Sequence, residues 1–557
     1  MRPRPEIIDQ WSFFDYKPAM NEFKFNNLAP GWVPEDDRRR LTAYTMLAGY
    51  VRNNSRAWLP STLNEDEILS RREYGDPATL IDSIVSSVMG ESQRILVDGA
   101  VDEDPAIPGA VIQQVLLEEW AFKERLMSKM LENERRTAEL GDAVYVLGWD
   151  PQKNRPRLRV YDPGFYFPVI DPDDDVEYPK TVHLAWEFER KNEFTNEKQH
   201  FLRRITWKLM DLDEPRRYPW QDVEEADSTT SCFMWDGEWL LSEGQTGLFD
   251  LSENAAVWTS QGVDLNLDFI PVVHLPNTVC EIEHFGVSSL ARVLQILDDI
   301  VSTDTDLQAS SATTGSPPIA ITGTAIPTDD QGRITTYGPG TVLKTGDGNA
   351  TMIDTSRSLD ALLEYDKHLL SRLSVNSRIP EALLGRVKPN EVPSGIALTL
   401  SFTPHANLIK EMRLIRKQKY NLLLKFVSRM YMQSGLISEV FDANLVFGSF
   451  LPADKQEAST LVTQLLREDR PLISLQTALE LLVKAGIPID DIQREIQRIN
   501  SEDLNGANTL LDATGDTGLV FQRLGLTASL ETVTGDEIVT QMQGMEGFSQ
   551  NDTVPPQ

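Results

Sequence analysis

The sequence predicts an α+β fold in which long helices alternate with antiparallel strands along one chain. Apolar residues recur at helical spacing up to Asp142 and again from Gly286 onward. From Ala143 to Asn277 apolar and polar residues alternate instead, and turn residues separate the runs, which is typical of hairpins. Further along, a Gly-, Pro- and Thr-rich stretch lies between two helical segments of similar length. Together these observations indicate a mixed body with a separate helical projection.

Length and composition indicate a globular protein of two to four domains. The 557 residues are 41% apolar and 25% charged, which is ordinary globular composition rather than that of a disordered chain. The formal net charge is −32. Tight binding of nucleic acid needs clustered Lys and Arg, so this charge argues against a protein that grips it. The same charge is compatible with a protein that lets nucleic acid pass, and equally with a solubility device.

Targeting signals and cysteine usage indicate a soluble protein that is not exported. The first residues lack the apolar stretch of a signal peptide, and no run approaches the roughly 20 apolar residues that span a bilayer. The two cysteines, Cys232 and Cys280, lie far apart in the sequence. A disulfide framework is therefore not expected, a reducing compartment fits, and both residues are interpreted as small, half-buried apolar side chains.

The elements before residue 286 divide into a helical part and a β-rich part. Helical spacing covers residues 37–54, 76–97 and 110–140, and the last of these segments ends at Gly141. A polar turn at residues 150–156 then predicts a hairpin. Asp236-Gly237, between aromatic runs, predicts a two-residue hairpin turn.

The projection begins with a predicted helix over residues 286–310. Its apolar positions form one stripe, which includes Leu290, Leu294, Leu297 and Val301. Short strands with tight turns follow in residues 311–356, and a second helix over residues 357–377 returns the same distance. Two helices of matched length around a small β module predict a stalk with a separate module at its tip.

Residues 378–394 are a loop rich in proline and glycine between two long helices. The loop breaks the helical pattern and carries Arg386 and Lys388, with only Glu391 downstream to offset them. A very long helix follows from Gly395 to about residue 433. Its central part has seven basic residues against Glu411 alone, and we expect these to face solvent or an acidic neighbour.

The end of the chain is predicted to contain a strand, shorter helices and a weakly ordered tail. The run "NLVFGSFLP" is a probable strand, and shorter helices follow through about residue 500. Residues 501–557 are rich in Gly, Thr and Asp, and Arg523 is their only basic residue.

Motifs for catalysis, nucleotide binding or metal binding are missing. The sequence has no G-x-x-x-x-G-K-[ST] loop, and H-E-x-x-H, C-x-x-C and G-x-S-x-G are also absent. The six histidines are scattered singly. We therefore expect no enzyme activity, no cofactor and no metal site.

Four aspartates in "DDIVSTDTD" are the best catalytic-looking candidates. They are Asp298, Asp299, Asp304 and Asp306. Close carboxylates can bind divalent metals for phosphodiester chemistry. Asp298 and Asp299, however, lie away from the apolar stripe of their helix, where nothing desolvates them. An acidic, water-lined surface is therefore preferred to a nuclease site.

The order of elements, and several local stretches, resemble the portal proteins of tailed bacteriophages. "GDAVYVLGWD" and "YDPGFYFPV" are similar to strands of that family's wing region. "FGVSSLARVLQILDDIVSTDTD" looks like the start of its stem, and "LSVNSRIPEALLGRVKPNEVPSGIALTLSFTPH" looks like the segment around its tunnel loop. The likeness covers approximately residues 38–500, and it depends on several stretches agreeing in order rather than on one diagnostic motif.

The resemblance implies a portal-like ring subunit. The ring, usually of twelve copies, sits at one capsid vertex, where double-stranded DNA is pumped in by the terminase motor and later leaves. The implied parts are, in order, a wing at 1–285, a stem helix at 286–310, a clip at 311–356, a stem helix at 357–377, a tunnel loop at 378–394, a long kinked wing helix and strand at 395–450, a crown at 451–500 and a tail at 501–557.

The resemblance also implies partners and a location. The partners are other copies of the chain, double-stranded DNA bound without sequence preference, the terminase large subunit, the major capsid protein and scaffold, and a head-completion adaptor, with no membrane. The location is the virion, and the host cytoplasm during assembly. In the clip, the residues implied for partner docking are Thr324, Asp329, Asp330, Arg333 and Tyr337.

Carried over by position, the loop and the stem would contact or face the DNA. Arg386, Lys388 and Asn390 would approach the duplex, and phosphate contacts of this kind carry no sequence information. The four stem aspartates would line an acidic wall that repels the backbone, or some would pair with a neighbouring subunit. The loop hinges implied are Pro380, Gly385, Pro389, Pro393 and Gly395.

Two other classes of protein stay open on the sequence alone. One is another virion structural protein, such as an adaptor or minor head protein, that oligomerises without a DNA channel. The other is a metal-dependent nuclease built on the aspartates. For Arg386 and Lys388 the plain alternative is a surface loop that is basic by chance.

Overall fold

The computed structural model describes much of the chain between residues 31 and 484, and nothing after 499. The described residues are 31–54, 71–100, 106–171, 177–191, 198–222, 224–241, 247–251, 258–259, 262–278, 284–315, 319–322, 349–352, 356–386, 395–450, 455–466, 472–484 and single positions between 487 and 499. The chain forms two compact units, residues 1–450 and 451–557. The fold is α+β, as the sequence predicts.

The N-terminal part of the first unit is helical, with one break that the sequence did not reveal. Its helices are α1 (Glu35–Val51), α3 (Asp76–Met89), α4 (Pro108–Lys123) and α5 (Leu126–Leu140). The expectation of one helix over 110–140 is wrong, because Arg125 adopts a left-handed conformation with φ of 55° and separates α4 from α5. The expected helix over 76–97 also ends early, at Gly90, and its last residues form a strand.

Gly141 ends α5 as expected, and the reason is steric. Its φ is 106°, and a Cβ there would lie 2.8 Å from the carbonyl oxygen of Gly286. The chain therefore comes close to itself at the point where α5 gives way to the first long strand.

Antiparallel sheets make up the β-rich part of the first unit. A three-stranded sheet has the order β10-β2-β3, a six-stranded sheet contains β4-β5-β6-β7-β8 with β9 beside β7, and β1 pairs with β13. The strands are β1 (Gln93–Val97), β2 (Asp142–Asp150), β3 (Arg155–Tyr161), β4 (Tyr166–Val169), β5 (Thr181–Lys191), β6 (Lys198–Arg216), β7 (Ser228–Leu240), β8 (Trp258–Thr259), β9 (Val263–Asp264), β10 (Val272–Pro276) and β13 (Ala443–Phe447).

One of the two predicted hairpin turns is confirmed and the other is wrong. The turn between β2 and β3 joins a hairpin in which Val144 pairs with Tyr161 and Asp150 with Arg155. Asp236-Gly237, in contrast, lies inside the continuous strand β7. Asp236 stays in the strand because Arg203 on β6 donates two hydrogen bonds to its carboxylate, at 2.9 and 2.7 Å.

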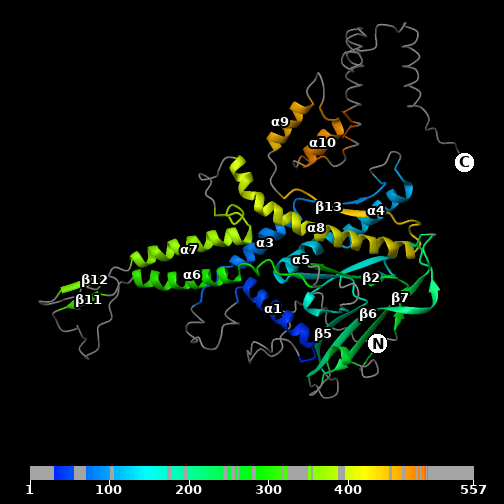
Figure 1. Cartoon of the computed structure of the whole chain (residues 1–557), viewed down its shortest axis with the longest axis horizontal. Coiled ribbons are helices and arrows are strands. Elements are labelled where there is room, and N and C mark those ends of the chain that lie inside the picture. The colour runs from blue at the N-terminus through cyan, green and yellow to red at the C-terminus, as the bar shows by residue number, and fades with distance from the viewer. Residues whose placement is uncertain are drawn as a thin grey trace, which may run out of the picture. The chain divides into compact units, whose positions relative to one another are not determined.

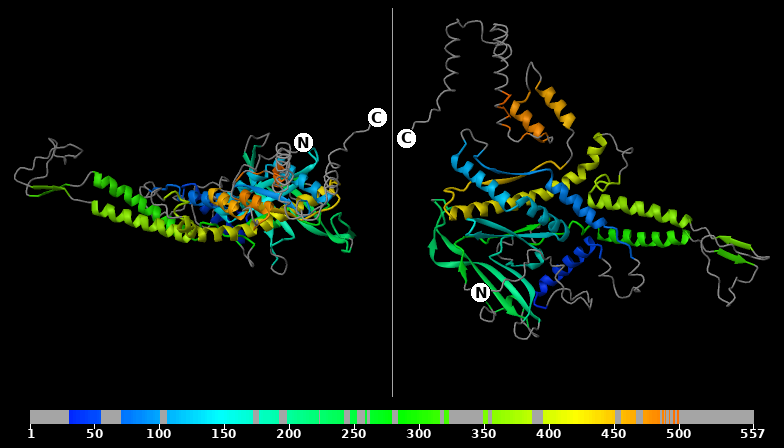
Figure 2. Two further views of the ribbon diagram at one scale, coloured as in Figure 1. Left: turned by 90° about the horizontal axis from the view of Figure 1, so that it is seen from above. Right: turned by 180° about the vertical axis from the view of Figure 1, so that it is seen from behind.

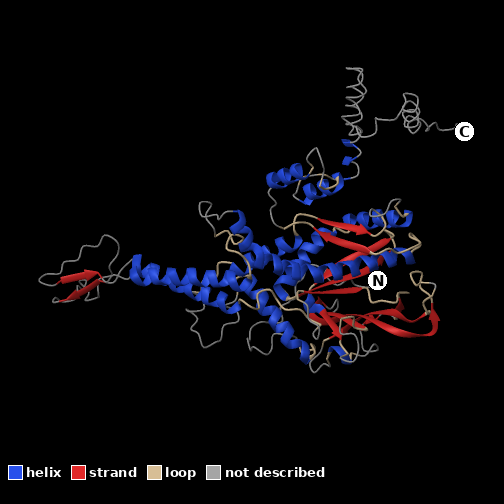
Figure 3. Ribbon diagram, turned by 45° about the horizontal axis from the view of Figure 1, so that its top comes forward, coloured by secondary structure: helices blue, strands red, loops and turns tan. Residues whose placement is uncertain are grey.

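Two long helices, which we call the arm, leave the body of the first unit side by side (Figures 1 and 2). They are α6 (Leu294–Gly315) and α7 (Ser356–Ser377), of 22 residues each. Beyond them in the chain, β11 (Ile319–Thr322) pairs antiparallel with β12 (Asn349–Met352). Figure 3 shows this pair of strands apart from the other sheets of the unit, which gather in the body.

The first helix of the arm starts eight residues later than predicted. Residues 286–290 are held instead against the junction of α5 and β2. The Gly286 amide donates to Asp142 at 2.8 Å, and the Ser288 hydroxyl donates to the carbonyl of Glu139 at 2.6 Å. The Gly286 amide would have no partner in the first turn of a helix, and here Asp142 supplies one. The helix therefore begins later.

A helix of 39 residues, α8 (Gly395–Gln433), crosses the body and matches the predicted bounds. The ribbon changes direction in the N-terminal part of α8 (Figures 1 and 2), where Pro404 removes one backbone hydrogen bond. The second unit contains α9 (Lys455–Leu465) and α10 (Leu475–Lys484). None of the described helices combines the length and apolarity needed to cross a membrane.

Candidate functional site: the arm and the loop base

The segment that leaves α7 is held firmly at its start. We call residues 378–386 the loop base. Arg378 turns the chain with φ of 59°, and Ile379, which is fully buried, follows it. The Ser374 hydroxyl donates to the carbonyl of Ile379 at 2.6 Å. Gly385 has φ of 73°, so the predicted hinge at this glycine does adopt a backbone conformation that favours Gly.

Arg386, at the end of the loop base, is engaged within its own chain. Its Nη2 lies 3.2 Å from Oδ1 of Asp76, at the start of α3, and both side chains are partly buried. Its charge also acts on Asp304 of α6 and Asp366 of α7. Sequence reasoning directed this guanidinium toward DNA. The structure pairs it with Asp76, and its contact with DNA stays a prediction.

Two carboxyl groups near Arg386, those of Asp304 and Asp366, have raised pKa values. Burial raises the pKa of Asp304 to about 6, repulsion from Asp366 and Asp76 adds to the rise, and Arg386 opposes it. Burial also raises the pKa of Asp366, with Arg386 again opposing and Asp76 adding. The group therefore holds more negative charge than one guanidinium balances.

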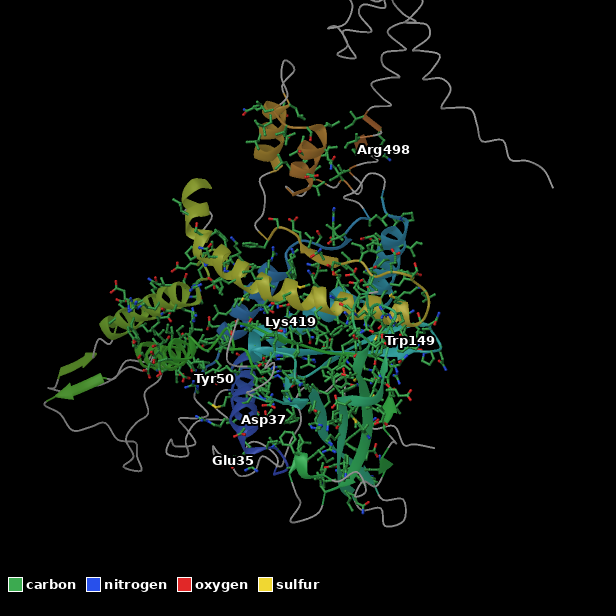
Figure 4. All side chains as sticks on the ribbon, turned by 45° about the vertical axis from the view of Figure 1, so that its right-hand side comes forward. Glu35, Asp37, Tyr50, Trp149, Lys419 and Arg498 are labelled. Atoms are coloured by element: carbon green, nitrogen blue, oxygen red, sulfur yellow. The ribbon has the colours of Figure 1, made fainter. Side chains whose placement is uncertain are left out.

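Asp298 of the arm is also paired within the chain rather than left on an open wall. Arg71 donates to its carboxylate at 2.5 Å, and the hydroxyl of Tyr50 donates at 3.0 Å. Figure 4 shows Tyr50 on α1, close to the base of the arm. Burial, followed by the Asp298 charge, raises the pKa of Tyr50 to about 12.

The other two stem aspartates, Asp299 and Asp306, lie nearer to solvent. Asp299 accepts a hydrogen bond from Gln295 at 3.1 Å, and Asp306 is exposed. In the part of the chain that the structure describes, no three His, Cys, Asp or Glu side chains are grouped so that they could hold a metal ion. Which of these aspartates faces a channel stays a prediction.

Several predicted site residues lie outside the described residues. In the loop they are Lys388, Pro389, Asn390 and Pro393, and in the clip they are Thr324, Asp329, Asp330, Arg333 and Tyr337. Pro380 lies in the described loop base, and Gly395 begins α8. Of the short strands predicted in residues 311–356, β11 and β12 are confirmed, and residues 323–348 lie outside the described residues.

The basic residues of α8 have neighbours in the body, as the sequence predicted for at least part of them. Arg416 is fully buried and contacts Glu134 of α5 at 3.1 Å. Lys419, labelled in Figure 4, contacts Glu177 at 2.6 Å. Arg413 donates instead to two backbone carbonyls at the end of α3. These cations therefore bind α8 to the body of the first unit.

Cys232 is buried in β7, which confirms its interpretation as a small apolar side chain. Burial raises the pKa of its thiol to about 12, so the reactive thiolate is suppressed. Cys280 lies outside the described residues.

Sequence reasoning missed the partners of the arm and of the loop base. Asp76 and Asp366 lie far from Arg386 in sequence, and Arg71 lies far from Asp298. No local pattern joins charges so separated, because the fold alone brings them together. Only the composition hinted at these ion pairs. In a chain with a net charge of −32, an arginine has many carboxylates available as partners.

Comparisons with known proteins find no matching family, and the likeness to the solved structure described below is weak. No protein-family model matches the chain, and no curated protein matches it. Among solved structures, a chain described as "Neck of empty GTA particle computed with C6 symmetry" matches with 11% identity and a TM-score of 0.41. The match covers 83% of this chain and 96% of that one. At such a score the likeness by itself establishes neither the fold nor the role of this chain.

Proposed function

We propose that this chain is a portal-type subunit of a phage-like particle. Copies of it form a ring, of twelve by the resemblance in its sequence, around a channel for double-stranded DNA. The protein acts by assembly and by passage of DNA, without catalysis, metal or cofactor. Its place is the head-to-tail connection of the virion.

The observation that carries the proposal is the arm and what adjoins it. Two side-by-side helices of equal length enclose a small β module, and the loop base and the 39-residue helix α8 follow in that order. This is the order of stem, clip, stem, tunnel loop and wing helix in the family that the sequence resembles. An arm of this kind serves to line a passage when several copies stand around one axis.

The surface of α7 supports contacts between copies. Leu363 is 43% exposed, Tyr365 49% and Val375 68%. These three side chains lie at separate points along and around α7, so only a neighbour that packs along the helix would cover more than one of them. In a ring, the adjacent copy would cover them, and the same contact would repeat at each subunit boundary.

Within this ring, the loop would contact DNA through Lys388 and Asn390. Arg386 is held by Asp76, so Lys388 is the cation that we propose for the phosphates. The exposed acids of α6 would keep the duplex from binding tightly, because like charges repel. The clip would dock the terminase large subunit and later the head-completion adaptor, and the wing and crown would meet the capsid protein and scaffold.

Photo-crosslinking in a packaging reaction tests the channel directly. A crosslinking residue at Asn390 should capture double-stranded DNA when packaging is stalled, and one at Phe122 should not. Phe122 lies on α4 and is 85% exposed, so it is a matched accessible position on the body. Equal capture at both positions, or capture at Phe122 alone, would contradict the proposal and favour a head protein without a channel.

A further inference from the structure

The loop base is attached to α3 through one side chain, close to acids of α6 and α7. Arg386 contacts Asp76 at the start of α3 at 3.2 Å, and its charge reaches Asp304 on α6 and Asp366 on α7. Elements that lie about 310 residues apart in sequence therefore meet at one guanidinium.

Three backbone hydrogen bonds form turns within the loop base. The Leu383 amide donates to the carbonyl of Pro380 at 2.9 Å, and the Gly385 amide to that of Ala382 at 3.2 Å. The Arg386 amide donates to the carbonyl of Glu381 at 3.1 Å. Leu383 and Leu384 pack against the core of the first unit. The Arg386 amide is thus held by one of these turns, and its side chain by Asp76.

We propose that Arg386 is a positioning residue, which latches the loop base to α3 through Asp76, while Asp304 of α6 and Asp366 of α7 add negative charge around this ion pair. The latch fixes the position of the loop base, which precedes residues 387–394 in the chain. That these residues then enter a channel depends on the proposed function, whereas the latch itself does not.

The charge balance of the latch makes it sensitive to pH. Three carboxylates face one guanidinium, and the pKa of Asp304, at about 6, is above its value in an unfolded chain. An acid whose pKa is raised by folding stabilises the folded state at low pH. This stability is lost as pH rises through the pKa that the acid has in the folded protein. The latch should therefore be tightest below about pH 6 and looser at pH 7.5.

A neighbouring set of charged groups along α6 is separate from the latch. Asp298 lies six residues before Asp304 and is bound by Arg71 and Tyr50, with Glu73 beside Arg71. Arg71 compensates this acid, so the uncompensated charge lies at Asp304 and Asp366. Substitutions at Arg386 should consequently leave the contacts of Asp298 unchanged.

Amide hydrogen exchange on the full-length, DNA-free protein tests the latch. Arg386→Gln should speed exchange of the Leu383, Gly385 and Arg386-position amides by about threefold to tenfold at pH 7.5, after correction for intrinsic rates. At pH 5.5 the increase should shrink, because protonation of Asp304 relieves the repulsion that the missing guanidinium leaves. Asp304→Asn should slow the same amides at pH 7.5.

A charge exchange separates the latch from simple packing. Arg386→Asp places four carboxylates together and should open the loop base most, whereas the double change Asp76→Arg with Arg386→Asp restores one cation among three acids. The double variant should exchange more slowly than Arg386→Asp alone. Arg39→Gln, at an exposed arginine of α1, is the matched control and should have no effect there.

Unchanged exchange of these amides in Arg386→Gln would overturn the latch. The latch would also be overturned if Arg386→Gln speeds exchange equally at pH 5.5 and 7.5, and if the double change Asp76→Arg with Arg386→Asp exchanges as fast as Arg386→Asp alone. Neither result depends on DNA or on ring formation. If exchange changes as expected but crosslinking at Asn390 fails, the latch stands and the proposed function fails.

Discussion

The body of the first unit and its arm bury their ion pairs to different degrees. In the body, Arg416 and Glu134 are fully buried, and each has further partners in the same chain. On the arm, α7 exposes Leu363, Tyr365 and Val375. The body also exposes large apolar side chains, since Phe122 is 85% and Leu414 63% exposed. Burial of charge, rather than exposed apolar surface, therefore distinguishes the two regions, and the larger effects on stability are expected in the body.

Removing the buried cation of the body should have the largest effect. Arg416→Met leaves Glu134 charged and buried without its partner, so the free energy of unfolding should fall by about 3–5 kcal/mol. Urea unfolding followed by tryptophan fluorescence measures the change. Lys417→Met, at the exposed neighbour on α8, is the control and should change stability by about 0.5 kcal/mol or less.

A double variant shows whether the loss comes from the stranded charge. Replacing Glu134 by Leu together with Arg416→Met removes both charges, and should recover a good part of the lost stability. A double variant as unstable as Arg416→Met would show that the body depends on the hydrogen bonds to Asn277 instead. Those bonds are 2.8 Å each, from two nitrogens of Arg416.

A smaller, pH-dependent effect is expected at Glu139, on the last turn of α5. Burial raises the pKa of its carboxyl to about 7, and repulsion from Asp162 adds to the rise while nearby arginines oppose it. Because the folded pKa is raised, stability is present at low pH and is lost as pH rises through about 7. The loss should be about 2 kcal/mol, since the side chain is half-buried and partly screened. Glu139→Gln should flatten stability between pH 5 and 7.5, and an unaltered slope would refute the assignment.

The ion pair at the base of the arm should matter less. Arg71 contacts Asp298 at 2.5 Å, but the Asp298 side chain is 38% exposed. Arg71→Gln should therefore lower stability by about 1 kcal/mol or less, and by less still in high salt. Thermal unfolding at two salt concentrations measures it. A loss of several kcal/mol that does not depend on salt would show that this ion pair stabilises the fold as strongly as the buried Arg416–Glu134 pair does.

The exposed face of the arm should matter least for the subunit alone. Val375→Asp adds a charge to a side chain that is 68% exposed, so the stability of the dissociated subunit should change by about 0.5 kcal/mol or less. Assembly should nevertheless be impaired, because the charge would be buried between copies. Analytical ultracentrifugation of this variant beside Lys417→Met separates the two effects.

Periodicity revealed the long helices of this fold but not the places where tertiary contacts override local pattern. The bounds of α8 and the hairpin of β2 and β3 followed from spacing and turn residues alone. The break at Arg125 did not, because a left-handed residue that is not glycine leaves no pattern. Asp236-Gly237 looked like a turn until Arg203, on the adjacent strand, held it in β7. The late start of α6 depends on Asp142, far away in sequence.

The candidate site was predictable in outline and not in its electrostatics. The loop, its hinge at Gly385 and its isolated cations could be seen in the sequence. The partner of Arg386 could not, because only the packing of the fold brings Asp76 of α3 to it. The same holds for Asp298, whose partners come from α1 and from the segment before α3.

Native mass of the purified protein, with imaging of the same species, tests the central claim most directly. The subunit mass is 62.8 kDa, so a closed ring of twelve would have a mass of roughly 750 kDa and an open centre. The account predicts such a ring, and predicts that Val375→Asp prevents it. A closed dimer that buries α7, or an assembly with no central passage, would contradict it.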